Sequence, residues 1–149
     1  MFGVVSKGEG DVLLHAGTGK GKTLSYLLPL ANQLYEGDEN LKVALVQPNG
    51  LLKAQIKSVV DRLVPDFSAS FRICTPRQLK DADADVCVVD EADLSLSAAC
   101  LPPKIKLSEF LRVEMGGKRR AIYAGATFPL ESNSRSIRAQ ILHYNKATQ

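Results

Sequence analysis

A glycine-rich segment near the start of the chain has the residue types and spacing of a loop that binds a polyphosphate. It consists of Ala16, Gly17, Thr18, Gly19, Lys20, Gly21, Lys22 and Thr23. Small residues let the backbone wrap closely around phosphates, so that successive N–H groups and the N-terminus of the next helix face the negative charge. We predict that this segment binds a nucleotide, with Lys22 at the β- and γ-phosphates and the Thr23 hydroxyl as a Mg²⁺ ligand. The structural alternative is a glycine turn that only joins a core strand to a core helix.

A second candidate for chemistry is the acidic segment Asp90-Glu91-Ala92-Asp93, which follows an apolar run. In a chain that already holds a phosphate loop, Asp90 is predicted to hold Mg²⁺, through water, and Glu91 to orient or deprotonate the attacking water. By itself such an acidic turn could equally be a solvated loop. The phosphate loop in the same chain favours the catalytic interpretation.

Five short apolar runs predict the strands that would position these groups. They span residues 12–14, 43–46, 71–74, 86–89 and 121–124. Most are continuously apolar rather than alternating, which is typical of parallel strands buried on both faces. Helices are expected over residues 24–35, 52–63, part of 97–115 and 134–144, with Pro29 bending or ending the first of them. The alternation predicts an α/β fold with a mainly parallel sheet of five or slightly more strands and helices on both faces, and with ligands at the strands' carboxyl ends.

Taken together, these motifs resemble the DEAD-box family of ATP-dependent RNA helicases. Residues 16–23 are similar to the family's Ala-x-Thr-Gly-x-Gly-Lys-Thr, and residues 88–93 to its Val-Val-Asp-Glu-Ala-Asp. Residues 47–55 resemble Pro-Thr-Arg-Glu-Leu-Ala-x-Gln, residues 75–77 resemble Thr-Pro-Gly-Arg, and residues 125–127 stand where the family has Ser-Ala-Thr. The motifs occur in the family's order, and the resemblance covers nearly the whole chain.

The resemblance implies a RecA-like P-loop NTPase domain that binds ATP and Mg²⁺ and grips the RNA backbone. Its catalytic residues would be Lys22, Asp90 and Glu91. The residues that couple the nucleotide state to RNA binding would be Asp93, Gly125, Ala126 and Thr127. The RNA path would be lined by Pro48, Asn49, Gly50, Thr75, Pro76 and Arg77. Residues 1–149 are expected to form one such lobe, truncated before residue 1 and without the second RecA-like lobe, so that the chain alone would turn over ATP negligibly.

The chain also departs from the family's pattern where RNA would bind. Gly50 stands in place of the RNA-contacting Arg, Arg77 directly follows Pro76, and Gly125 lacks the hydroxyl of the family's Ser. These departures leave open a second function, that of a non-catalytic, helicase-derived assembly or scaffold protein in a ribonucleoprotein such as an assembling ribosome. A third alternative is an unrelated phosphate-loop enzyme, such as a small-molecule kinase.

Composition sets wider limits on function. The chain has 149 residues, 45% hydrophobic and 23% charged, which is ordinary for a globular protein, and no apolar run approaches the roughly 20 residues needed to span a bilayer. We expect a soluble, intracellular protein without a membrane partner, in a compartment that the sequence does not specify.

The net charge of +3 is too small to indicate nucleic acid by itself, and the basic cluster at residues 118–120 is expected to be solvated. Cys74, Cys87 and Cys100 are expected to be reduced and not to bind zinc.

Overall fold

A five-stranded parallel sheet lies at the centre of the protein, with its strands in the order β1-β5-β4-β2-β3. The computed structural model describes residues 11–15, 20–116, 118, 120–125 and 140–142. The strands are β1 (Val12–His15), β2 (Val43–Val46), β3 (Phe71–Cys74), β4 (Val86–Val89) and β5 (Arg120–Gly125). The predicted parallel α/β sheet is therefore confirmed, and β2, β3 and β4 have the predicted bounds.

The strands are continuously apolar because the sheet is covered on both faces. Every residue of β2, β4 and β5 is buried. Successive side chains of a strand point to opposite faces. In β2, Val43 and Leu45 belong to one hydrophobic cluster, whereas Ala44 and Val46 belong to a second cluster on the other face. Two layers of core thus sandwich the sheet and fix the register of its strands.

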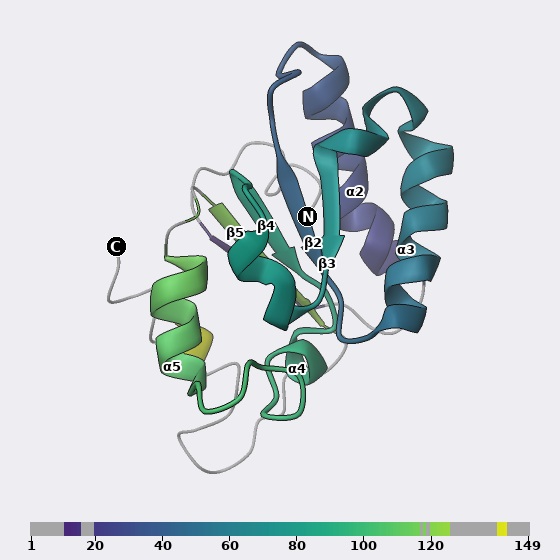
Figure 1. The fold of residues 1–149 in the computed structure, drawn as a ribbon. Coiled ribbons are helices and arrows are strands. Elements are labelled where there is room, and N and C mark those ends of the chain that lie inside the picture. Colours follow the sequence, from purple (N-terminus) through teal and green to yellow (C-terminus); the bar gives the residue numbers. More distant parts are fainter. Residues whose placement is uncertain (1–10, 16–19, 117, 119, 126–139, 143–149) are drawn as a thin grey trace.

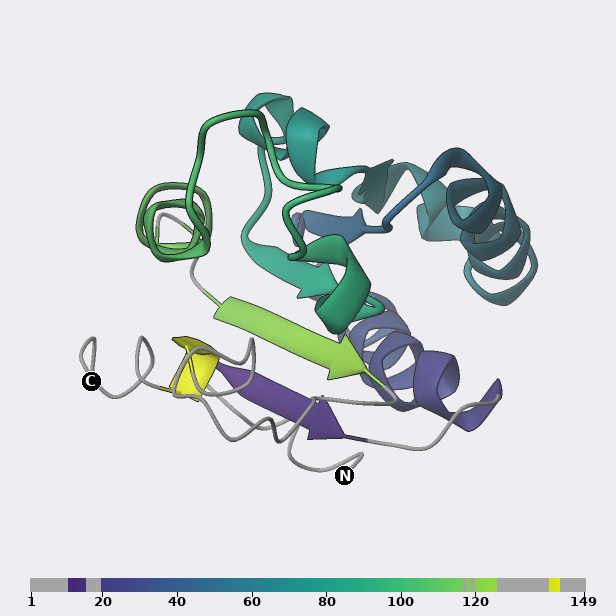
Figure 2. The same ribbon diagram turned by 90° about the horizontal axis from the view of Figure 1, so that it is seen from below.

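Two long helices, α2 (Lys20–Tyr35) and α3 (Gly50–Leu63), cover one face of the sheet (Figure 2). The first turn of α3 is capped by Asn49, whose side-chain oxygen accepts a hydrogen bond from the N–H of Leu52 at 3.0 Å. Ile56 and Val60 are its buried residues, in keeping with the predicted apolar stripe. After α2 the backbone turns at Gly37, whose φ of 127° favours glycine.

The observed bounds of α2 differ from the prediction at two points. The helix begins at Lys20 rather than near residue 24, so the end of the glycine-rich segment forms its first turn. It also continues through Pro29 to Tyr35, so the expectation that Pro29 could end it is wrong. Proline removes one helical hydrogen bond. Burial offsets this cost, because Leu27, Leu30 and Leu34 on either side of Pro29 are completely buried against the sheet.

Shorter elements cover the opposite face. They are η2 (Pro76–Asp81), α4 (Ala92–Ser95), α5 (Leu107–Phe110) and η3 (Leu111–Met115), while η1 (Pro65–Ser70) follows α3 (Figure 1). The helical region expected within residues 97–115 is confined to α5 and η3, and η3 is wound as a π-helix. Residues 140–142 are helical, and the rest of the helix predicted over 134–144 lies outside the described residues. Among the described helices, none has the length and apolar character needed to cross a bilayer.

Arg120, in the basic cluster at residues 118–120, does not lie on the solvated face that the sequence indicates, and Arg119 lies outside the described residues. Arg120 is the first residue of β5 and is only 6% exposed. Burial lowers the pKa of its guanidinium, and the nearby Asp11 carboxylate opposes that effect. The ammonium of Lys118 donates a hydrogen bond to the carbonyl oxygen of Ala82 at 3.1 Å. Both side chains therefore belong to the amino-terminal edge of the sheet.

The three cysteines are free thiols, as expected. Cys74 and Cys87 lie in the core of the second face, and burial raises the pKa of both thiols. They act as small apolar side chains in the sheet.

Candidate nucleotide-binding site

The predicted catalytic residues meet at the carboxyl edge of the sheet. Lys22 lies in the first turn of α2, and Asp90 and Glu91 directly follow β4. Figure 1 shows the strand arrows pointing toward α4, which begins immediately after Glu91. The structure therefore brings together side chains that are 68 and 69 positions apart in the sequence (90 − 22 and 91 − 22).

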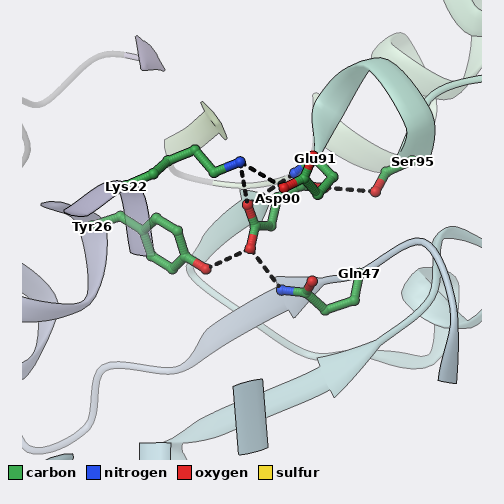
Figure 3. Close-up of polar contacts among 6 residues, drawn as sticks. All are labelled: Lys22, Tyr26, Gln47, Asp90, Glu91 and Ser95. Carbon is green, nitrogen blue, oxygen red and sulfur yellow. Dashed lines mark hydrogen bonds and ion pairs between the residues drawn. The ribbon is translucent and has the colours of Figure 1, made fainter. Parts of the chain in front are cut away.

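The ammonium group of Lys22 is held between two carboxylates (Figure 3). Its Nζ lies 2.7 Å from Oε1 of Glu91 and 3.8 Å from Oδ1 of Asp90. Lys22 is only 5% exposed, and a buried cation needs anionic or hydrogen-bonding partners. An incoming phosphate could take the place of Glu91 as the partner of this cation, because the Glu91 side chain is 38% exposed and could turn toward water.

Glu91 adopts a left-handed backbone conformation, with φ 47° and ψ 53°. This conformation costs a residue with a Cβ atom on the order of 1 kcal/mol. Such a strained conformation is kept where contacts with the surrounding structure hold the backbone in place, and this is often the case at functional sites. Here it places the Glu91 side chain next to Lys22 at the point where β4 turns into α4.

Asp90 is anchored more tightly than the sequence indicates. Its Oδ2 accepts hydrogen bonds from the hydroxyl of Tyr26 at 2.9 Å and from Nε2 of Gln47 at 3.2 Å. Its Oδ1 accepts the N–H of Glu91 at 2.9 Å, and its carbonyl oxygen accepts the hydroxyl of Ser95 at 2.7 Å. Figure 3 shows Tyr26 and Gln47 approaching the carboxylate from α2 and from the end of β2. The orientation of Asp90 is thus set by contacts to several elements at once.

Tyr26 and Gln47 were missed by reasoning from the sequence. A weak signal existed, because Tyr26 lies about one helical turn after Lys22 and Gln47 directly follows β2, at the edge where ligands bind. Burial, followed by the charge of Asp90, raises the pKa of Tyr26 well above its usual value. The hydroxyl therefore stays protonated at neutral pH and donates to the carboxylate.

A pocket of about 440 Å³ opens beside these residues, between α2 and α3. It is lined by Lys22, Thr23, Leu24, Gln47, Leu52, Gln55, Ile56, Val59, Arg62, Asp90 and Glu91. Its chemistry fits a magnesium-bound polyphosphate, because it combines a buried cation with a hydroxyl and a carboxylate oxygen. Within the described part of the chain, no group of three or more His, Cys, Asp or Glu side chains could hold a metal ion. Mg²⁺ would accordingly need phosphate and water oxygens to complete its shell, as it usually does.

Several predicted residues fall outside the described part of the chain. These are Ala16, Gly17, Thr18 and Gly19 of the nucleotide loop, and Ala126 and Thr127 of the coupling segment. Of the remaining coupling residues, Asp93 is half-buried in α4, which packs against β5, and Gly125 ends β5. Both lie near the candidate site, but their predicted coupling role stays a prediction.

The two predicted RNA-binding segments lie side by side. Residues 48–50 follow β2 and residues 75–77 follow β3, its parallel neighbour. The N–H of Gln47 donates to the carbonyl oxygen of Cys74 at 2.8 Å, and the ammonium of Lys53 donates to Oε1 of Gln78 at 3.1 Å. The backbone and side chains thus join the starts of α3 and η2 into one continuous edge, next to the pocket.

Most of these side chains have local structural roles as well. Asn49 caps α3, and Pro48 and Pro76 are buried. The guanidinium of Arg77 donates to the carbonyl oxygens of Leu101 at 3.3 Å and Ala99 at 3.4 Å, in the loop after α4. RNA binding at this edge stays a prediction.

Known proteins resemble both the sequence and the fold. A family model described as DEAD/DEAH box helicase matches residues 2–83, which is more than half of the chain. The chain belongs to the DEAD/DEAH box helicase family. The matched segment includes the glycine-rich loop, whereas Asp90 and Glu91 lie beyond it. The structure places both carboxylates beside Lys22, which lies within the matched segment.

Similar curated proteins are named as RNA helicases. Over 57 residues the chain is 42% identical to the mitochondrial ATP-dependent RNA helicase MSS116 of Eremothecium gossypii, a match that covers 37% of this chain and 9% of that protein. Over 79 residues it is 38% identical to the ATP-dependent rRNA helicase spb4 of Aspergillus clavatus, covering 50% of this chain and 12% of that protein. The matches span about a tenth of the length of these relatives.

The fold also matches a solved structure of a helicase. A crystal structure of a hypothetical ATP-dependent RNA helicase from Sulfolobus tokodaii superposes with a TM-score of 0.68, covering 96% of this chain and 47% of that chain. The sequence identity is 19%, so this similarity concerns the fold alone. It agrees with the RecA-like architecture that the resemblance implied.

Proposed function

We propose that residues 1–149 are the ATP-binding RecA-like lobe of an ATP-dependent RNA helicase. The observation that carries the proposal is the buried Lys22 ammonium beside the carboxylates of Asp90 and Glu91, at the edge of the pocket. A cation at the N-terminus of a helix that follows a glycine-rich loop is suited to polyphosphate. Family membership supports the same nucleotide chemistry.

In this proposal each side chain of the site has a separate task. Lys22 exchanges its contact with Glu91 for the β- and γ-phosphates, and Thr23 and Asp90 hold Mg²⁺. Bound Mg²⁺ would offset the negative charge of the phosphates. Once released from Lys22, Glu91 orients the attacking water and accepts its proton. In the full-length protein a second RecA-like lobe would close over this site and couple hydrolysis to the binding of RNA.

Lys22→Ala is the direct test of the nucleotide site. Removing this charge-assisted contact should weaken binding of ATP or ADP in the presence of Mg²⁺ by roughly ten- to a hundredfold, as judged by titration calorimetry. Lys57→Ala is a matched control, because Lys57 pairs with Asp61 on the exposed side of α3. Equal nucleotide affinities of Lys22→Ala and wild type would overturn the assignment.

RNA is proposed to bind by its backbone along the edge formed by residues 48–50 and 75–77, with little sequence preference. Gly50 offers a test by gain of function, since it is exposed and a Cβ atom there would meet no heavy atom within 4 Å. Gly50→Arg, which adds a guanidinium at this position, should tighten single-stranded RNA binding roughly tenfold at low salt. The slope of the logarithm of the binding constant against the logarithm of the salt concentration should become steeper by about 0.7.

Ser58→Arg adds the same charge about two turns further along α3, at another exposed position, and serves as the control for Gly50→Arg. Fluorescence anisotropy over a series of salt concentrations measures both variants. If Gly50→Arg binds RNA no better than Ser58→Arg, the RNA path does not run along this edge.

A further inference from the structure

We propose that Tyr26 and Gln47 are positioning residues that determine which oxygen of Asp90 faces the magnesium-bound nucleotide. The inference rests on the proposed function of the site and adds two residues to it. Tyr26 is completely buried and Gln47 is 2% exposed, and both donate to the same carboxylate oxygen. We name the three side chains Tyr26, Asp90 and Gln47 the Asp90 clamp.

The clamp gives the two oxygens of Asp90 different surroundings. Oδ2 accepts its hydrogen bonds from Tyr26 and Gln47. Oδ1 accepts the backbone N–H of Glu91 and lies 3.8 Å from the ammonium of Lys22. Figure 3 shows Oδ1 on the Lys22 side of the carboxylate and Oδ2 turned toward Tyr26 and Gln47. The oxygen next to Lys22 accepts one of these hydrogen bonds whereas Oδ2 accepts two, so it is the one with acceptor capacity left for a further ligand or its water.

The backbone of Asp90 is fixed as firmly as its side chain. Its N–H donates to the carbonyl oxygen of Val46 at 3.0 Å, which continues the pairing of β2 with β4 beyond the strand ends. Its carbonyl oxygen accepts the hydroxyl of Ser95. With the backbone held in this way, the remaining freedom of Asp90 is rotation of the carboxylate, and the clamp restricts that rotation.

The chemical type of the clamp residues suits this role. A phenol and an amide are neutral donors, so they orient the carboxylate without cancelling its negative charge. An arginine or lysine on Oδ2 would fix the carboxylate equally well but would weaken its attraction for a cation. Partners of metal-binding carboxylates typically change metal affinity by 10- to 100-fold when they are lost.

The test separates magnesium-dependent from magnesium-independent nucleotide binding. ADP is titrated into wild type, Tyr26→Phe and Gln47→Leu, each in Mg²⁺ and again in EDTA. The affinity for ADP in Mg²⁺ is divided by the affinity in EDTA for each protein. Losing a clamp donor should lower this ratio about tenfold, while the affinity in EDTA stays near that of wild type. Tyr35→Phe is the matched control, because it removes a hydroxyl from the exposed side of the same helix, where it donates to Asp66 at 3.3 Å.

Each outcome decides between the clamp and a simpler structural role. If the clamp variants unfold at lower urea concentrations but keep the wild-type affinity ratio, Tyr26 and Gln47 only stabilise the fold and the inference is wrong. If either variant does not fold, the other reports on the same oxygen from the opposite side. If wild type binds ADP in neither condition, the proposed function fails and the clamp fails with it. If wild type binds ADP equally in Mg²⁺ and EDTA, the clamp and the magnesium-binding roles of Thr23 and Asp90 fail, whereas the nucleotide site at Lys22 stands.

Discussion

Glu91→Gln is expected to lower ATP hydrolysis by the proposed two-lobe helicase at least a hundredfold, while nucleotide binding is retained. The amide keeps the size of the side chain but cannot accept a proton from the attacking water, and general-base catalysis is typically worth 10²–10⁴-fold. Lys22 also loses a carboxylate at 2.7 Å that competes with phosphate for its charge. We therefore expect nucleotide affinity to stay the same or to rise severalfold, which is opposite in sign to the effect of Lys22→Ala.

Phosphate release measured with saturating RNA, together with nucleotide titration, checks both parts of this prediction. Asp61→Asn is the matched control, because it neutralises the carboxylate of the exposed pair with Lys57 on α3. Unchanged hydrolysis in Glu91→Gln would remove Glu91 from the catalytic assignment. A wild-type protein that binds nucleotide but shows no RNA-stimulated hydrolysis would favour the scaffold function over the helicase function.

Leu30→Ala should lower the free energy of unfolding by about 2–5 kcal/mol. Leu30 is completely buried in the cluster between α2 and the sheet, so truncation leaves a cavity in a packed core. The change is also expected to shift the urea midpoint without altering the slope of the transition, because the surface exposed on unfolding is nearly the same. Chemical unfolding followed by circular dichroism measures this effect.

Leu28→Ala provides a control on the same helix. Leu28 is 38% exposed, so the same truncation should lower the free energy of unfolding by about 1 kcal/mol or less. The two substitutions have the same effect on helix propensity and differ in burial. If both substitutions lower the free energy of unfolding equally, the face of α2 that carries Leu30 does not pack against the sheet.

The strands, and the residue types gathered in the glycine-rich loop, could be predicted from the sequence. Continuous runs such as residues 43–46 and 86–89 predicted buried parallel strands, because a side chain on either face had to be apolar. The glycine-rich loop and the acidic segment after β4 could also be recognised, since both depend on residue types at short spacing. Both lie at strand ends, where an α/β sheet forms its ligand sites. The meeting of Lys22 with Asp90 followed from that topology.

The orientation of these groups depends on tertiary packing. The Asp90 clamp depends on contacts between residues 43 and 64 positions apart, and the local positions of Tyr26 and Gln47 in the sequence give only a weak signal of these contacts. The continuation of α2 through Pro29 and the burial of Arg120 also depend on packing, since burial outweighs local preference in both cases. Local residue types therefore predicted which chemical groups are present, whereas long-range packing determined how the carboxylate of Asp90 is held and which of its oxygens faces Lys22.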